Sequence, residues 1–226
     1  MQRITIALLL LLAQPVWAAM SLDKMVIHLD AAPNAREDVV VSNPDNETIY
    51  VQTEVYRVDH PGRKDEKKVL ITDPRDFKLL VSPSKAVIPA GASKRFRLMS
   101  VETGIDNEKV YRVTFKPVVG KITSKATGVK ILVAYQALIF VQPKDGAYQL
   151  ALHKFGDHWQ LANRGNINVE VRQLRFCRAQ GDCEALPSIG RLYAGAHKDL
   201  KLPADQGYLK LNAFDGSDGV EKTFPL

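Results

Sequence analysis

Residues that could do catalytic chemistry are few in this chain, and they lie apart. The five histidines are scattered, and only two of them are close in sequence, with a turn expected at Gly156 between them: His28, His60, His153, His158 and His197. The sequence contains no nucleophile elbow, no H-E-x-x-H motif, no P-loop and no G-x-G-x-x-G fingerprint. We therefore predict a protein that is not an enzyme and holds neither a cofactor nor a metal ion. Because carboxylate pairs form in space rather than in sequence, an all-β hydrolase stays open as an alternative.

The two cysteines predict a structural bond. Cys177 and Cys183 are only a few residues apart in FCRAQGDC, a spacing wider than that of a redox C-x-x-C motif, and no further metal ligands stand nearby. In an exported chain, such a pair is typical of a disulfide that closes a small loop. We expect it to stabilise the fold by about 2 kcal/mol or less, because the loop is short.

The N-terminus predicts export. Residues 1–18 follow the pattern of a secretory signal peptide, with Arg3 before the apolar stretch Ile4–Leu12 and with Ala18 before the expected cleavage site. The apolar stretch is shorter than the ~20 residues that cross a bilayer, and no later segment is a candidate. We expect an exported, soluble protein that is not inserted in a membrane, with an uncleaved anchor as the alternative.

The longest apolar stretch outside the N-terminus is Gly128–Pro143, and the rest of the fold is expected to be organised around it. Its β-branched and aromatic residues favour a strand over a helix. Side chains of a strand alternate between two faces, and the first half of this strand is apolar on both. Either the strand lies in the middle of a covered sheet, or its second apolar face contacts another chain, and we favour the second explanation. We assign to that contact Val129, Ile131, Val133 and Tyr135.

The other segments predict an all-β protein with two domains. Short alternating segments recur every 8–12 residues or so with turn signals between them, the pattern of a sandwich or barrel. Pro143–Gly146 looks like a hinge, so we expect domains at residues 19–143 and 147–226, the second a smaller β-sandwich. The mixed charges of Arg63–Lys68 are typical of a solvated loop. The first domain is expected to contain the strands Ser21–Asp30, Glu37–Ser42, Thr48–Val58, Phe77–Val81, Ala86–Ile88, Lys94–Val101 and Val110–Val119.

Several motifs occur in an order that resembles a known family. The turn S-N-x-x-N begins at Ser42, the stretch P-A-G begins at Pro89 and is followed by F-R-L from Phe96, and Y-R-V-T-F-K-P begins at Tyr111. The long strand then ends in IFVQP, and a short second domain with a cysteine pair follows. In this order and spacing, the chain resembles the periplasmic chaperones of chaperone–usher pilus assembly over nearly all of its length after residue 18.

The resemblance implies a fold and a mechanism. It implies two immunoglobulin-like β-sandwich domains set at an angle, with a cleft between them. It also implies that a strand of the chaperone completes the sandwich of a pilus subunit by donor-strand complementation, until the subunit is delivered to an outer-membrane usher. The expected partners are therefore pilin subunits and the usher, and no nucleotide is required.

The basic residues that the family uses to bind the subunit are not found at their usual positions in this sequence. The family usually carries two basic residues in the cleft, which bind the C-terminal carboxylate of the subunit by charge-assisted hydrogen bonds. The corresponding positions fall near Val26 and Leu138, which are apolar. Either the anchor has moved, or the protein belongs to an alternative branch with a different anchor. The basic candidates nearby are Arg112 and Lys116, which we favour, and Lys24 and Lys144.

Composition and patterning also bear on nucleic acid, sugars and a second copy of the chain as partners. The formal charge of +6 is mild, and no basic stripe with interleaved aromatics is present, so nucleic acid is not expected. The alternative of a secreted adhesin or carbohydrate-binding module predicts sugar binding through exposed aromatic side chains. An exposed apolar strand also makes self-association of the free protein an expectation.

Overall fold

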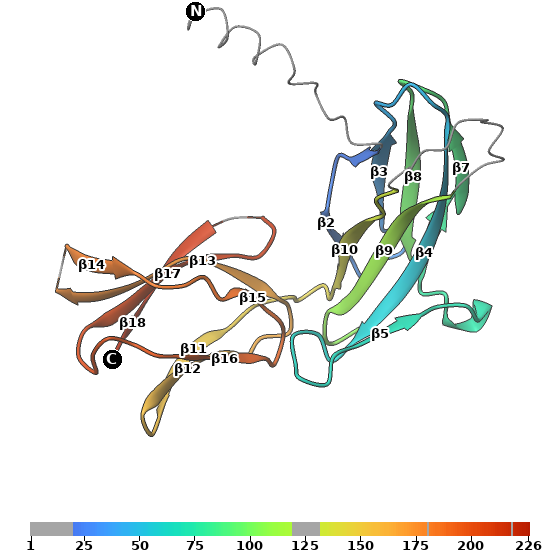
Figure 1. The fold of residues 1–226 in the computed structure, drawn as a ribbon. Helices are drawn as coiled ribbons and strands as arrows, with labels where there is room; N and C mark the ends of the chain where they lie inside the picture. The colour runs from blue at the N-terminus through green and yellow to red at the C-terminus, as the bar shows by residue number, and fades with distance from the viewer. Residues whose placement is uncertain (1–19, 119–131, 180, 218) are drawn as a thin grey trace, which may run out of the picture.

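The computed structural model describes residues 20–118, 132–179, 181–217 and 219–226. The expected signal peptide, residues 1–18, lies outside them. Within these residues every regular element is a strand except one short 3-10 helix, η1 (Pro74–Asp76), and no helix is long and apolar enough to cross a membrane. The strands build two sandwiches set at an angle to each other (Figure 1), which confirms the predicted fold class.

Strands β1 to β10 form the N-terminal sandwich. One sheet has the order β1-β3-β8-β6, and the other has the order β2-β10-β9-β4-β5 with β7 beside β4. The apolar faces of the two sheets enclose a single core, in which Phe96, Val113 and Phe115 are fully buried. The strands are β1 (Ser21–Leu22), β2 (Val26–Asp30), β3 (Arg36–Ser42), β4 (Ile49–Asp59), β5 (Lys67–Leu70), β6 (Leu79–Ser82), β7 (Lys85–Ile88), β8 (Ser93–Ser100), β9 (Lys109–Val118) and β10 (Tyr135–Gln142).

The first strand expected from the sequence is in fact two strands. Residues 21–30 divide into β1, which pairs with β3 in one sheet, and β2, which pairs with β10 in the other. Asp23 fixes the chain between the two strands through Val40 of β3. The backbone N–H of Asp23 donates to the carbonyl of Val40, and the carboxylate of Asp23 accepts the backbone N–H of Val40. The edge of the sandwich therefore passes from one sheet to the other within a few residues.

The organising strand is shorter than its apolar pattern predicts. The strand β10 begins at Tyr135, whereas the sequence predicted a strand from Gly128; residues 132–134 are not part of a strand, and residues 128–131 lie outside the described part of the chain. Apolar alternation alone does not produce a strand, because each backbone group also needs a hydrogen-bonded neighbour. The strand β9 supplies that neighbour only from Tyr135 onwards, opposite Phe115.

Strands β11 to β18 form the C-terminal sandwich. One sheet has the order β11-β12-β16, and the other has the order β14-β13-β17-β18 with β15 beside β13. Cys177 and Cys183 lie directly opposite each other on β13 and β14 and form the predicted disulfide. The strands are β11 (Leu150–Phe155), β12 (His158–Asn163), β13 (Val169–Ala179), β14 (Asp182–Ala185), β15 (Gly190–Leu192), β16 (His197–Leu200), β17 (Tyr208–Phe214) and β18 (Gly219–Pro225).

A buried asparagine fixes one turn in each domain. The amide of Asn43, at the end of β3, donates to the carbonyls of Glu47, Ile88 and Pro89. Asn163, at the end of β12, plays the same part, since its amide donates to the carbonyls of Ile167 and Leu192. Each side chain replaces backbone partners that the turn would otherwise leave unsatisfied in the interior. This explains the S-N-x-x-N turn seen in the sequence.

The two domains meet around Phe140 and a buried polar cluster. The ring of Phe140 contacts His28 and Tyr193 and lies beneath the guanidinium of Arg191, 4.8 Å from the ring centre. Nearby, Glu108 accepts hydrogen bonds from the backbone N–H and the side-chain amide of Asn168, at 3.3 Å and 2.6 Å.

The charged groups of this junction are held away from water. Gln142 also donates to Glu108, and Arg191 donates to the side chain of Asn168. Burial raises the pKa of Glu108 above its ordinary value, although the hydrogen bonds from Gln142 and Asn168 oppose the rise. Burial likewise lowers the pKa of Arg191. The junction is therefore specified by directional contacts as well as by apolar packing.

The disulfide should contribute modestly to stability. Replacing Cys177 and Cys183 by alanine together removes a bond between residues six apart in sequence, and we expect a loss of about 2 kcal/mol in the free energy of unfolding. Urea denaturation of the oxidised protein and the double variant measures the difference, and the reduced wild-type protein is the control. Equal stability of the oxidised and reduced proteins would contradict the prediction.

Glu108 should make stability depend on pH. Because its pKa is raised in the folded state, protonation of Glu108 favours folding: the contribution is complete below the ordinary pKa and is lost as the pH rises through the raised one. Relative to Glu108→Gln, which does not titrate, the wild-type protein should therefore gain stability as the pH falls from about 7 to about 4. Parallel urea titrations across this range measure the difference, and a difference that does not change with pH would show that burial does not perturb this carboxyl.

Candidate functional site

The strand β10 has an edge that is only half covered. On one side it pairs with β9 along Tyr135–Val141. On the other side β2 pairs with it in parallel, but only from Leu138 onwards, opposite Val26. Within the described residues, no strand pairs with this second edge at Tyr135–Ala137. An open edge presents unpaired backbone N–H and C=O groups, to which another strand can add.

The two faces of β10 have different neighbours. The odd-numbered residues Ala137, Ile139 and Val141 are fully buried in the core of the N-terminal domain, and Tyr135 packs partly buried against the same core. The even-numbered residues lie on the opposite face, where Phe140 enters the domain junction. Of the residues assigned to contact with a second chain, Val133 lies just before β10 with 51% of its surface exposed, and Val129 and Ile131 lie outside the described residues.

The register of the sheet brings together the positions at which the resemblance implies an anchor. Val26 on β2 is the direct neighbour of Leu138 on β10, and Leu138 is the direct neighbour of Arg112 on β9. Directly opposed residues share a face of the sheet. The row continues through Tyr56 on β4 to Leu70 on β5. Arg112 is therefore the basic residue next to the two apolar positions, on the same face.

The guanidinium of Arg112 is incompletely paired. Its Nη1 donates to Oε1 of Gln136 at 3.2 Å, and its Nη2 lies 3.9 Å from Oε1 of Glu66. Its Nε is buried without a hydrogen-bond partner. The side chain keeps 26% of its surface exposed, so the group has donors to offer and is accessible to a ligand. Because guanidinium donors match the two oxygens of a carboxylate, the site suits a carboxylate ligand.

The other three basic candidates are placed less favourably. The Nζ of Lys116, further along β9, lies 3.5 Å from Glu54, and 54% of the lysine side chain is exposed. Lys24 forms an ion pair with Glu37. Lys144 is exposed in the turn after β10. Of the four candidates, only Arg112 lies in the row with Val26 and Leu138.

Two further residues of the site could not be found from the sequence. Glu66 belongs to the charged stretch that was expected to be a solvated loop, and part of that stretch in fact begins the edge strand β5. Tyr193 comes from the C-terminal domain and packs against Phe140, and burial raises its pKa. Both are brought to Arg112 by the fold, and neither is marked by a motif.

The titratable groups at the end of the N-terminal domain nearest the junction are largely paired with one another. A hollow of about 680 Å³ is lined there by residues that include Arg57, Asp59, Glu102 and Tyr111. Arg57 donates two hydrogen bonds to Asp59 and lowers its pKa. The hydroxyl of Tyr111 donates to Glu102 at 2.6 Å, and burial raises the pKa of the tyrosine. Within the described residues, no group of three histidine, cysteine or acidic side chains is placed to hold a metal ion.

Two relatives and two solved structures are similar to this chain. A CFA/I fimbrial subunit of Escherichia coli is 30% identical over 230 residues, which cover 95% of this chain and 93% of the relative. A CS1 fimbrial subunit of Escherichia coli is 28% identical over 198 residues, 82% of each chain. The crystal structure of the class 5 fimbriae chaperone CfaA has a TM-score of 0.72 and 24% identity, and covers 92% of this chain and 100% of its own. The SafB chaperone, solved in complex with the Salmonella enterica SafA pilin, has a TM-score of 0.67 and 16% identity, with 94% and 99% covered.

The match to a known family covers more than half of the chain. The family described as pili and flagellar-assembly chaperones, PapD N-terminal domain, matches residues 19–147. That range includes β10, its half-covered edge and Arg112. This chain therefore belongs to the family of pili and flagellar-assembly chaperones.

Proposed function

We propose that this chaperone captures fimbrial subunits in the periplasm by adding the edge of β10 to the sheet of an incomplete subunit. The observation that carries the proposal is the half-covered edge at Tyr135–Ala137. A subunit strand that pairs there extends the sheet and satisfies the backbone groups that the chaperone leaves open. The SafB chaperone, which has this fold, is bound to a pilin, and we infer a partner of the same class for this chain.

The side chains that precede β10 would supply the specificity of the contact. Val133 belongs to the apolar series that begins at Val129 and Ile131. Tyr135, the last residue assigned to this series, packs partly buried against the core of the chaperone's own N-terminal domain and is left out of the proposed contact. Burial of each large apolar side chain contributes about 1.5–3 kcal/mol, so the series supports a stable complex after the costs of association are subtracted. It also allows exchange when another strand of similar pattern replaces the donor. We propose that this exchange occurs at an outer-membrane usher, and it requires no cofactor.

Arg112 is the proposed anchor for the C-terminal carboxylate of the subunit. The long contact of its Nη2 to Glu66 leaves hydrogen-bonding capacity for a ligand on a side chain that is 26% exposed. A carboxylate at this position would lie beside the apolar side chains of Val26 and Leu138. The adjacent open edge of β10 begins in the same part of the sheet. One subunit strand could therefore pair with the edge and place its last residue at Arg112.

Removal of the anchor should weaken capture without unfolding the chaperone. We expect Arg112→Ala to lower the affinity for a fimbrial subunit by about tenfold or more, because a charge-assisted hydrogen bond is lost. Lys116→Ala, which removes a cation from the same strand, is the matched control and should bind as the wild type does. Co-purification from periplasmic extract, with circular dichroism of each variant, measures both properties. If the Arg112→Ala and Lys116→Ala variants recover the subunit equally well, Arg112 is not the anchor.

A charge on the donor segment should abolish capture. Val133→Asp places a carboxylate at an exposed position that no strand includes, so the fold should remain intact while the apolar contact is lost. Val220→Asp, at a valine of the C-terminal domain that is 43% exposed, is the matched control. Ile139→Asp should instead unfold the domain, because Ile139 is fully buried. A folded Val133→Asp protein that recovers the subunit normally would contradict donation by this segment.

A further inference from the structure

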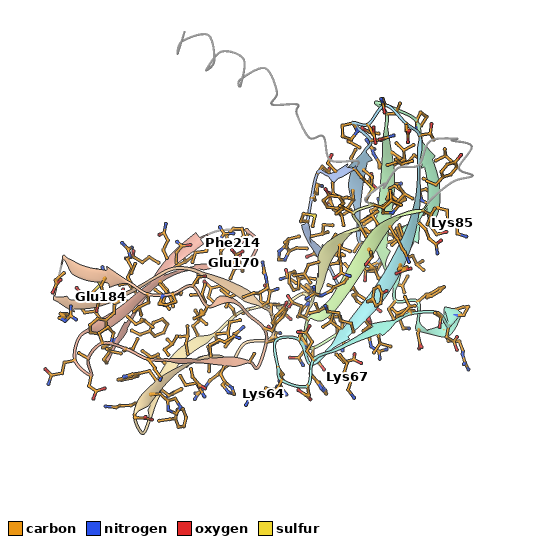
Figure 2. The ribbon with its side chains drawn as sticks, in the orientation of Figure 1. Lys64, Lys67, Lys85, Glu170, Glu184 and Phe214 are labelled. Atoms are coloured by element: carbon orange, nitrogen blue, oxygen red, sulfur yellow. A yellow bond between two sulfur atoms is a disulfide. The ribbon has the colours of Figure 1, made fainter. Side chains whose placement is uncertain are left out.

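The loop between β4 and β5 reaches from the N-terminal domain to the C-terminal domain. Figure 1 shows this loop beside the C-terminal sandwich, and Lys64 marks it in Figure 2. Gly62 packs so closely on the ring of Tyr193 that a Cβ there would lie 2.5 Å from the ring, and its φ of +75° also favours glycine. The guanidinium of Arg63 donates to the carbonyl of Gly195 at 3.4 Å. The loop is thus held from both domains.

The same loop presents a carboxylate to Arg112. One oxygen of Glu66 accepts the backbone N–H of Gly62 at 2.8 Å, and the backbone N–H of Glu66 donates to the carbonyl of Arg63. The other oxygen lies 3.9 Å from Nη2 of Arg112. The position of this carboxylate is therefore set by the loop and only secondarily by the arginine.

The contact differs from the arginine–carboxylate pairs of this chain that form two hydrogen bonds. Arg57 with Asp59, Arg97 with Asp38 and Arg172 with Glu170 each form two hydrogen bonds, at distances between 2.7 and 3.1 Å. Arg175 with Glu221 is by contrast a long pair of one atom from each group, at 3.7 Å, in the C-terminal domain. At Arg112 the pair is long and joins one atom of each group, so a carboxylate occupies the guanidinium without satisfying it.

We propose that Glu66 is an intrachain competitor for the Arg112 anchor, which the C-terminal carboxylate of a client must displace. The inference rests on the proposed function of Arg112. Two carboxylates at one guanidinium repel each other, so an incoming carboxylate binds fully only when Glu66 turns away. Glu66 thereby lowers the affinity of the free chaperone for its client and keeps the complex weak enough to be exchanged.

The test compares two forms of one ligand. The probe is a short synthetic peptide of alternating valine and threonine that ends in a free carboxylate, and the same peptide ending in an amide is its partner. Glu66→Gln removes the charge and keeps an oxygen to accept the N–H of Gly62. At low ionic strength we expect this variant to bind the carboxylate form about two- to fivefold more tightly than the wild type, in line with a partly exposed ion pair, and to bind the amide form equally.

A second acidic residue provides the matched control. Glu54 carries a carboxylate of similar exposure, 24% against 26% for Glu66, and contacts Lys116 instead of Arg112. Glu54→Gln should leave the affinity for both peptides unchanged, and isothermal titration calorimetry measures all the affinities. If Glu54→Gln gains as much affinity for the carboxylate peptide as Glu66→Gln does, the effect comes from the change in net charge, and the inference is overturned.

The outcomes separate the inference from the function beneath it. If Arg112→Ala loses the preference for the carboxylate form while Glu66→Gln binds as the wild type does, the role of Arg112 as the anchor is supported. The role of Glu66 as a competitor is then wrong. If the wild type binds both peptide forms equally, Arg112 does not bind the terminal carboxylate. The proposal that Glu66 competes for Arg112 is then wrong as well. Thermal unfolding of each variant shows that the comparison is made between folded proteins.

Discussion

The structure depends on the two-sided packing of one strand. The odd-numbered residues of β10 must fill the core of the N-terminal domain, and its even-numbered residues must lie on the opposite face, where Phe140 enters the domain junction, because strand side chains alternate with a period of two. A shift of one residue would exchange these faces and expose the core set, so the register is strongly specified. The covered part of β10 is thereby fixed from Leu138 to Gln142 by β2. The edge at Tyr135–Ala137 is left open on a strand that cannot slide.

The domain junction continues from the same strand. Phe140 projects from the face of β10 that carries the even-numbered residues and packs against Tyr193 and Arg191 of the C-terminal domain. Gln142 of the same strand donates a hydrogen bond to Glu108. Polar groups that are buried at a junction must meet partners in a definite geometry, and Glu108 meets Asn168 in this way. The orientation of the second domain, and with it the position of Tyr193 near Arg112, is therefore tied to the strand that carries the open edge.

The sequence predicts much of the fold and little of the site. Alternating apolar residues and turn signals were sufficient for most strands and for the all-β class, and the spacing of Cys177 and Cys183 was sufficient for the disulfide, because these depend on local chemistry. The change of sheet between β1 and β2 depends on Asp23 meeting Val40. The strand β5 was missed because its four residues, Lys67–Leu70, are all exposed and carry two charges, a composition typical of a loop. The approach of Glu66 to Arg112 depends on a loop held by the other domain, and no sequence pattern reports such a contact.

The register also supports the anchor that we propose at Arg112. Val26 and Leu138 are direct neighbours in the sheet, and Arg112 is the next residue in the same row. Neighbouring strands are about 4.8 Å apart, a distance smaller than the reach of an arginine side chain. In our proposal, the anchoring cation has moved from β10 to β9 and still lies on the same face of the sheet, next to the usual position. What such a move changes is the environment of the cation, because Arg112 is closer to β4 and to the loop that carries Glu66. If the anchor is Arg112, as we propose, the shift by one strand also brings it next to the carboxylate of Glu66.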